Sequence, residues 1–296
     1  MSRFSLRAAA FLLVATSVSV SQTAPDLTAR FGDADVEGFS VNPDIRLTAA
    51  YAADQSACEM KIELKHSILK EPERGVGMAP EVVAKIVKEL IPRSERGILL
   101  NNITADMGGV EERIFQYQNV TITHYFLHQL PAHHNEDLAT IVRRDGLCGA
   151  SNNGRENESV AIPLKALDLQ MRYGDPEVQR FAVRPAVSLM AEYGPERTVC
   201  RMLLEPQVSI LRKNEPAKYL RPELVTEILD EVIPESDRGA ETSHSVTKSG
   251  CNEIDIAEYL HVTIVRFRHN CQLPDPETEE RATITRKDAG CEALKK

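Results

Sequence analysis

Two alternations of apolar and polar residues recur along the chain. The stretch 58–64 alternates apolar with charged positions, a period of two that predicts a half-buried strand. The stretches 79–91 and 221–233 instead place apolar residues on one face of a helix. Pro80 and Pro222 suit the first turn of these helices, where a missing N–H costs nothing. The pattern therefore predicts strands and amphipathic helices mixed in one chain.

The second feature is an internal match. When the sequence is shifted by 142 positions, residues 26–127 align with 168–269 without a gap, and 36 of 102 positions are identical. Unrelated chains of this composition would share roughly six positions, about the frequency of a common residue. We predict two tandem copies, a first domain at 22–148 and a second at 167–296, joined by a polar linker at 149–166.

Both copies are predicted to contain the same elements. A short helix ends at Gly32 or Gly174, where a left-handed C-cap favours glycine. Strands, a helix and a hairpin with a last strand follow, in the first copy at 41–51, 58–64, 79–91, 110–117, 120–126 and 139–144. The order β-β-α-β-β-β with local connections indicates an α+β fold, an antiparallel sheet with one main amphipathic helix per copy. Whether the two sheets join is left open.

The N-terminal 21 residues have the pattern of a signal peptide. Two arginines precede an apolar run over 8–20, and Ser19 and Ser21 supply small residues for cleavage. The run is shorter than the roughly 20 apolar residues of a spanning helix. We expect a secreted or periplasmic mature chain that begins near Gln22 and has no membrane span.

The net charge of the chain limits the kinds of partner that it can bind. The chain has 35 Lys and Arg against 44 Asp and Glu, a net charge of −9. A nucleic-acid-binding protein needs a basic face to meet phosphates, so this class is disfavoured. An unidentified protein or a small polar ligand remains as the expected partner.

The six cysteines are expected to form disulfides in an oxidising compartment. The internal match pairs the positions of Cys58 and Cys148 with those of Cys200 and Cys291. The remaining Cys251 and Cys271 have no counterparts in the first copy, and both face each other across a predicted hairpin. The predicted bridges are therefore Cys58–Cys148, Cys200–Cys291 and Cys251–Cys271. Metal binding is the rival interpretation, but no C-x-x-C motif is present.

No standard catalytic motif, phosphate-binding loop or dinucleotide fingerprint is present, which weakens the enzyme hypothesis and predicts no cofactor. One cluster of possible metal ligands stands out, because imidazoles suit zinc or copper: His124, His128, His133 and His134. The alternative is a polar loop with solvated histidines.

Charged residues shared by the two copies are candidate binding residues, since carboxylates and guanidiniums can hold a polar ligand: Arg30, Asp33, Arg96, Arg172, Asp175 and Arg238. Their structural alternative is to fix elements in place, with Arg96 and Arg238 meeting carbonyls at a helix end. Arg266 and Arg268 make one strand basic in the second copy alone. They form either a docking patch for an acidic partner or a solvated strand face.

The motif Arg172-Tyr-Gly-Asp-Pro, followed by Phe181-x-Val-Arg-Pro185, Tyr193-Gly and Cys200, resembles uncharacterised secreted proteins of soil bacteria of the acidobacterial kind. The resemblance covers most of each copy and implies a secreted or periplasmic location. It implies nothing about chemistry, because no activity is known for that family. The first copy departs from the motif at Asn42 and Ala52.

The leading hypothesis is a disulfide-stabilised tandem-repeat binding or interaction module. Duplication favours it, because two equivalent copies provide either a groove between them or bivalency. The alternative is a hydrolase or metal-dependent enzyme that uses the histidine cluster or the groove between the copies. A third possibility is a purely structural envelope protein.

Overall fold

The computed structural model describes residues 23–65, 78–106, 110–127, 135–144, 164–185, 187–206, 220–269, 279–287 and 291. The predicted signal peptide at 1–21 and most of the predicted linker at 149–166 lie outside these residues.

Fourteen strands in the described part of the chain form one sheet. Those of the N-terminal half are β1 (Val36–Asn42), β2 (Ile45–Tyr51), β3 (Ala57–Leu64), β4 (Leu99–Asp106), β5 (Val110–Tyr117), β6 (Val120–Leu127) and β7 (Asn135–Arg143). Those of the C-terminal half are β8 (Val178–Arg184), β9 (Val187–Tyr193), β10 (Val199–Pro206), β11 (Glu241–Ser249), β12 (Asn252–Tyr259), β13 (Val262–His269) and β14 (Glu279–Arg286). The order across the sheet is β11-β12-β13-β14-β10-β9-β8-β1-β2-β3-β7-β6-β5-β4, so it reads the same from either end when equivalent strands are exchanged.

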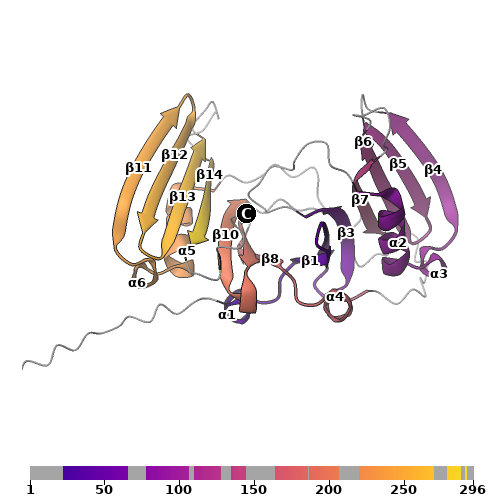
Figure 1. The fold of residues 1–296 in the computed structure, drawn as a ribbon, viewed down its shortest axis with the longest axis horizontal. Helices are drawn as coiled ribbons and strands as arrows, with labels where there is room; N and C mark the ends of the chain where they lie inside the picture. Colours follow the sequence, from indigo (N-terminus) through magenta and orange to yellow (C-terminus); the bar gives the residue numbers. More distant parts are fainter. Residues whose placement is uncertain are drawn as a thin grey trace, which may run out of the picture.

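Among the described residues, six helices and a 3-10 turn accompany the sheet: α1 (Ala24–Phe31), α2 (Pro80–Leu90), α3 (Arg93–Arg96), α4 (Ala166–Tyr173), η2 (Pro195–Arg197), α5 (Pro222–Val232) and α6 (Glu235–Arg238). Figure 1 shows the sheet as two wings, β4–β7 with α2 and α3 on one side and β11–β14 with α5 and α6 on the other. Strands β1 and β8 join the wings in the middle, and α1 and α4 lie beneath this junction.

The predicted α+β class with two β-β-α-β-β-β copies is wrong. The protein is mostly antiparallel β, with one sheet shared by both halves and more than one helix in each half. The region 41–51, predicted as one strand, instead contains the end of β1, a turn at Pro43 and the whole of β2. Strands β4 and β11 were missed because they are exposed edge strands, and a strand without a buried face has no alternation to detect.

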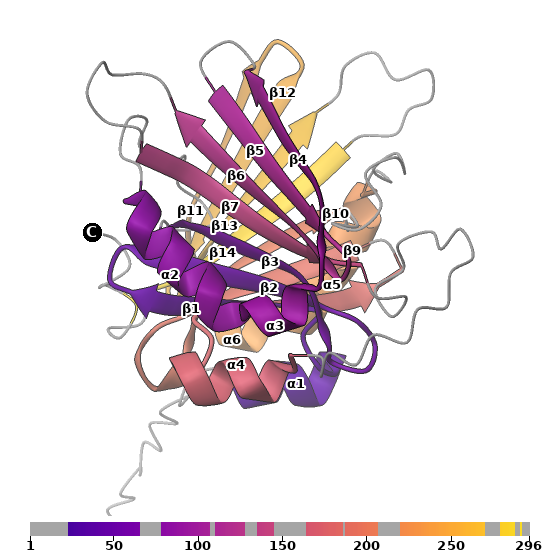
Figure 2. The ribbon, with the colours of Figure 1, turned by 90° about the vertical axis from the view of Figure 1, so that its right-hand side faces the viewer.

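The main helices follow the predicted amphipathic pattern. Helix α2 buries Val83, Ile86, Val87 and Leu90, and α5 buries the residues 142 positions later. Val82, which the pattern placed on the same face, is exposed. Helix α2 contacts β7, and Figure 2 shows it in front of β1–β3. Burying each such side chain stabilises the fold by about 1.5–3 kcal/mol.

The two hydrophobic cores exchange their first helices. Leu27 of α1 is 1% exposed and packs with Phe181, Leu189 and other residues of the C-terminal half. Leu169 of α4 is 0% exposed and packs in the core of the N-terminal half. Each half therefore completes its core with a helix from the other half.

The ends of these crossing helices are fixed by glycine and arginine. Gly32 and Gly174 both have φ of 82° and ψ of −167°, a region that only glycine enters readily, although it is not the left-handed helical region expected from the sequence. Arg30 Nη1 donates to the carbonyl of Glu231 in α5, and Arg172 Nη1 donates to the carbonyl of Glu89 in α2, both at 2.7 Å. These last-turn carbonyls have no partner within their own helix, so each arginine caps a helix of the opposite half.

The outer edges of the sheet differ in character. Strand β4 has no charged residue from Leu99 to Ala105, and it exposes Leu99, Leu100 and Ile103 beside the exposed Ile98. The equivalent strand β11 carries Glu241, His244 and Lys248. Charged residues discourage strand addition at an edge, so β4 lacks a protection that β11 has.

Candidate functional site

The centre of the sheet places two equivalent positions opposite each other. Strand β1 pairs antiparallel with β8 through Val36↔Arg180, Glu37↔Gln179 and Gly38↔Val178. Residues 178, 179 and 180 are the equivalents of 36, 37 and 38, and they face 38, 37 and 36 in reverse order. This register is that of a local two-fold axis. The axis passes between Glu37 and Gln179.

A row of buried hydrogen bonds crosses this axis. Gln179 Nε2 donates to Glu37 Oε1 at 2.7 Å, and Tyr51 Oη donates to Glu37 Oε2 at 3.0 Å. On the other side, Tyr193 Oη donates to Gln179 Oε1 at 2.9 Å. Glu37 is only 4% exposed. An amide opposite a carboxylate avoids the repulsion that two facing glutamates would create.

The same row shifts the acidity of both tyrosines. Burial raises the pKa of the Tyr51 phenol far above its usual range, and the nearby Glu37 carboxylate raises it further. Burial also raises the pKa of Tyr193. Both phenols therefore stay protonated and donate hydrogen bonds at any physiological pH.

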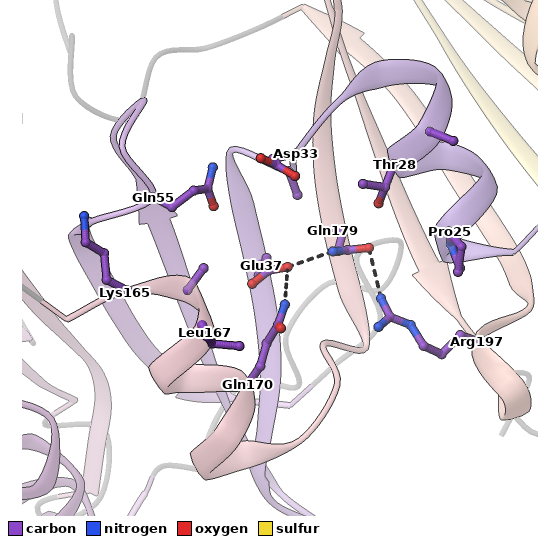
Figure 3. Close-up of a pocket in the computed structure, with 13 residues that line it drawn as sticks. Pro25, Thr28, Asp33, Glu37, Gln55, Lys165, Leu167, Gln170, Gln179 and Arg197 are labelled. Carbon is purple, nitrogen blue, oxygen red and sulfur yellow. Dashed lines mark hydrogen bonds between the residues drawn. The ribbon is translucent and has the colours of Figure 1, made fainter.

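A pocket with a volume of about 610 Å³ lies against this row, between α1 and α4. Its size is that of sites for small molecules. Figure 3 shows residues of both halves around the Glu37–Gln179 pair. The lining consists of Pro25, Thr28, Ala29, Asp33, Ala34, Glu37, Gln55, Lys165, Ala166, Leu167, Gln170, Gln179 and Arg197.

Two strained turns supply equivalent side chains to the pocket. Gln55, between β2 and β3, has φ of 62°, and Arg197, between β9 and β10, has φ of 56°. Non-glycine residues rarely adopt positive φ, and such strain persists where the surroundings hold it, often at binding sites. Figure 3 places Gln55 and Arg197 on either side of the Glu37–Gln179 pair.

The cations of the pocket already have partners. Arg197 Nη1 lies 3.0 Å from Asp175 Oδ1, and Arg197 Nη2 donates to Gln179 Oε1 at 3.3 Å. Lys165 Nζ contacts Asp54 Oδ2 at 2.7 Å and Ser56 Oγ at 2.8 Å. The hydrogen bond from Lys165, with those from Ser56, lowers the pKa of Asp54 to about 2.

The carboxylates of the first half are less well compensated. Gln55 stands where the second half has Arg197, so Asp33 lacks the guanidinium that its equivalent Asp175 has. No cationic side chain of the described residues pairs with Asp33. Of the shared charged residues singled out from the sequence, Asp33 lines the pocket and Asp175 pairs with a pocket residue.

Arg96 and Arg238 lie where the structural interpretation placed them. Arg96 Nε donates to the carbonyl of Ile91 at 2.9 Å, and Arg238 Nε donates to the carbonyl of Ile233 at 2.8 Å. These carbonyls follow the ends of α2 and α5. Arg96 and Arg238 therefore stabilise helix ends, as Arg30 and Arg172 do, and none of the four arginines lines the pocket.

Arg266 and Arg268 hold a buried carboxylate. Glu280 of β14 is 0% exposed and forms ion pairs with both guanidiniums, at 3.1 Å from Arg268 Nε. Arg268 Nη1 also lies 2.8 Å from Glu253 Oε1. The two charges are therefore balanced within the sheet, and docking of an acidic partner stays a prediction from the sequence.

The histidine cluster falls largely outside the described residues. His124 of β6 lies between two aromatic rings, 5.8 Å from Phe115 and 6.2 Å from Phe126 between centroids. His128, His133 and His134 are not among the described residues. Within the described part of the chain, no three His, Cys, Asp or Glu side chains are placed to hold a metal ion. A metal site at the cluster stays a prediction.

The Cys200–Cys291 disulfide is confirmed, with a Cα–Cα distance of 5.2 Å. The bond joins Cys200 of β10 to Cys291, which comes after β14, and the two cysteines are 91 positions apart in the sequence. Cys58 and Cys251 are also disulfide-bonded. Their predicted partners, Cys148 and Cys271, lie outside the described residues, so those two pairings stay predictions.

Sequence reasoning missed most of the pocket. It searched for charged residues that both copies share, whereas Glu37, Gln55, Gln179 and Arg197 occupy positions where the two halves differ. The signal was present in the aligned halves as the exchanges Glu37/Gln179 and Gln55/Arg197. Only the pairing of β1 with β8 shows that these positions meet.

Comparison with models of protein families and with curated proteins finds no match, so function must be inferred from the site itself. Among the described residues, no helix combines the length and apolar character needed to cross a membrane.

Proposed function

We propose that this chain is a secreted or periplasmic binding protein that holds one small polar molecule in the pocket between its halves. The observation that carries the proposal is the pocket itself, which is built by both halves around the local two-fold axis and flanked by two strained turns. The signal-peptide pattern and the Cys200–Cys291 disulfide support the location.

The position of the pocket favours one ligand per chain. A site within one repeat would occur twice in a duplicated chain, but a site on the axis between repeats occurs once. Of the two consequences expected from duplication, a groove between copies therefore has more support than bivalency. We expect a ligand-to-protein ratio of one to one.

The chemistry of the lining favours binding over a reaction. The buried carboxylate of the lining, Glu37, accepts hydrogen bonds on both oxygens, from Tyr51, Gln170 and Gln179. Such a carboxylate is held in place as a fixed negative charge, which suits recognition of a polar group. Apolar side chains such as Pro25 and Leu167 would contact the carbon part of the ligand.

Native mass spectrometry of the mature protein from an oxidising periplasm tests this proposal. We expect a small-molecule adduct in one-to-one ratio that disappears on denaturation. Ala29→Trp should abolish it, because Ala29 is exposed on α1 and lines the pocket. Ala84→Trp is the control, at an exposed position of α2 outside the pocket. An adduct retained by Ala29→Trp, or none in the parent protein, would count against the proposal.

A further inference from the structure

The two sides of the pocket carry different charge although they occupy equivalent positions. Asp33 corresponds to Asp175 at a shift of 142, Glu37 to Gln179 and Gln55 to Arg197. The first half thus has two carboxylates and an amide where the second has one carboxylate, an amide and a guanidinium. Both exchanges make the first half more negative.

At these three positions the second half is neutral, and its guanidinium already has partners. Arg197 pairs with Asp175 and also donates to Gln179, so its guanidinium is already shared between two acceptors. Lys165, at the N-cap of α4, is held by Asp54 and Ser56 of the first half. An anionic ligand would have to compete with these partners for either cation.

The first half retains its negative charge. Each group that donates to Glu37 is neutral, namely the phenol of Tyr51 and the amides of Gln170 and Gln179. Asp33 has no cationic partner among the described residues. A positive group that enters the pocket would therefore meet two uncompensated carboxylates in a partly desolvated site, where charge-assisted hydrogen bonds are strong.

From this asymmetry we infer that the bound molecule is a small organic cation, an aliphatic ammonium or guanidinium compound whose charged group lies against Asp33. This inference rests on the proposed function. The carbon chain lies against the alanines, Pro25 and Leu167 of α1 and α4.

Three probes of equal chain length separate the charge classes: 1,4-diaminobutane, 1,4-butanediol and succinate. We expect isothermal titration calorimetry on the mature oxidised protein to show binding of the diamine in preference to the other two. Gln55→Arg places the second half's residue in the first half and should pair with Asp33. We expect it to weaken diamine binding by roughly tenfold or more, the loss of one charge-assisted hydrogen bond.

The reciprocal variant should act in the opposite direction. Arg197→Gln frees Asp175 and removes a positive charge, so diamine binding should strengthen. Both residues already have a positive φ, 62° at Gln55 and 56° at Arg197, so neither exchange places a side chain in a backbone conformation that its counterpart does not already adopt. Asp33→Asn should weaken binding as Gln55→Arg does. Asp44→Asn makes the same change of charge in the exposed turn between β1 and β2, outside the pocket, and should leave binding unchanged.

The outcomes separate the two proposals. Succinate binding that Ala29→Trp abolishes would overturn the cation inference and leave the proposed function standing. Equal binding of the diamine and the diol, or equal effects of the two reciprocal variants, would also overturn it. If none of the probes binds, the inference fails, and the native-mass comparison of Ala29→Trp with Ala84→Trp decides separately whether the pocket is a binding site.

Discussion

The exchange of α1 and α4 between the two cores predicts that a mutation in one half destabilises the other. Leu27 belongs to the N-terminal half by sequence, yet it is buried against Phe181, Leu189 and other residues of the C-terminal half. We therefore expect Leu27→Ala to loosen the C-terminal core, and Leu169→Ala to loosen the N-terminal core.

The size of the effect follows from burial. Truncating a fully buried leucine to alanine loses roughly 2 kcal/mol of transfer free energy, and the remaining cavity adds about 1–2 kcal/mol. Leu27 and Leu169 are 1% and 0% exposed, so each variant should lose about 3–4 kcal/mol of unfolding free energy. The neighbouring Leu167 is 64% exposed, and Leu167→Ala should change stability by about 0.5 kcal/mol or less.

Urea unfolding measures the loss, and hydrogen exchange read by mass spectrometry locates it. In Leu27→Ala, protection should fall in β8–β10 and α5 more than in β1–β3 and α2. In Leu169→Ala the order should reverse. Loss of protection confined to the half that carries the mutation would refute the helix exchange.

Two further predictions concern an ion pair and a sheet edge. Asp54→Asn removes the negative charge that pairs with Lys165. The stability difference from the parent should be full above about pH 4 and should largely vanish as the pH falls to about 2, because the folded-state pKa of Asp54 is lowered from 3.8 to about 2. Ile103→Lys should reduce self-association in sedimentation experiments, because it places a charge on the apolar β4 edge, whereas Ser245→Lys at the equivalent position of β11 should not.

Each of these two predictions can be contradicted by a specific result. Asp44→Asn is the control variant for the pH series. A stability difference between Asp54→Asn and the parent that persists unchanged at pH 2 would show that the contact is not an ion pair. For the edge, equal association of the parent and Ile103→Lys proteins would show that β4 does not mediate contact between copies.

The spacing of apolar residues in the sequence was enough to predict those helices and strands that bury one face. The spacing of Val83, Ile86, Val87 and Leu90 placed α2 to within a residue or two, and alternation placed β3, because burial on one side imposes a period on the sequence. The internal match also identified Cys200 and Cys291 as partners, since equivalent cysteines in each copy constrain each other.

Tertiary structure decided what joins these elements. The pairing of β1 with β8 is made by backbone groups that every residue carries, so no side-chain pattern specifies it. Strand β4 could not be predicted either, because both of its faces are exposed and its sequence has no alternation of apolar and polar residues. For Leu27, an apolar residue in an amphipathic helix, the sequence indicates burial but does not indicate that the core belongs to the other half. The pocket depends on all of these long-range choices, because it exists only where Glu37 of one half meets Gln179 of the other.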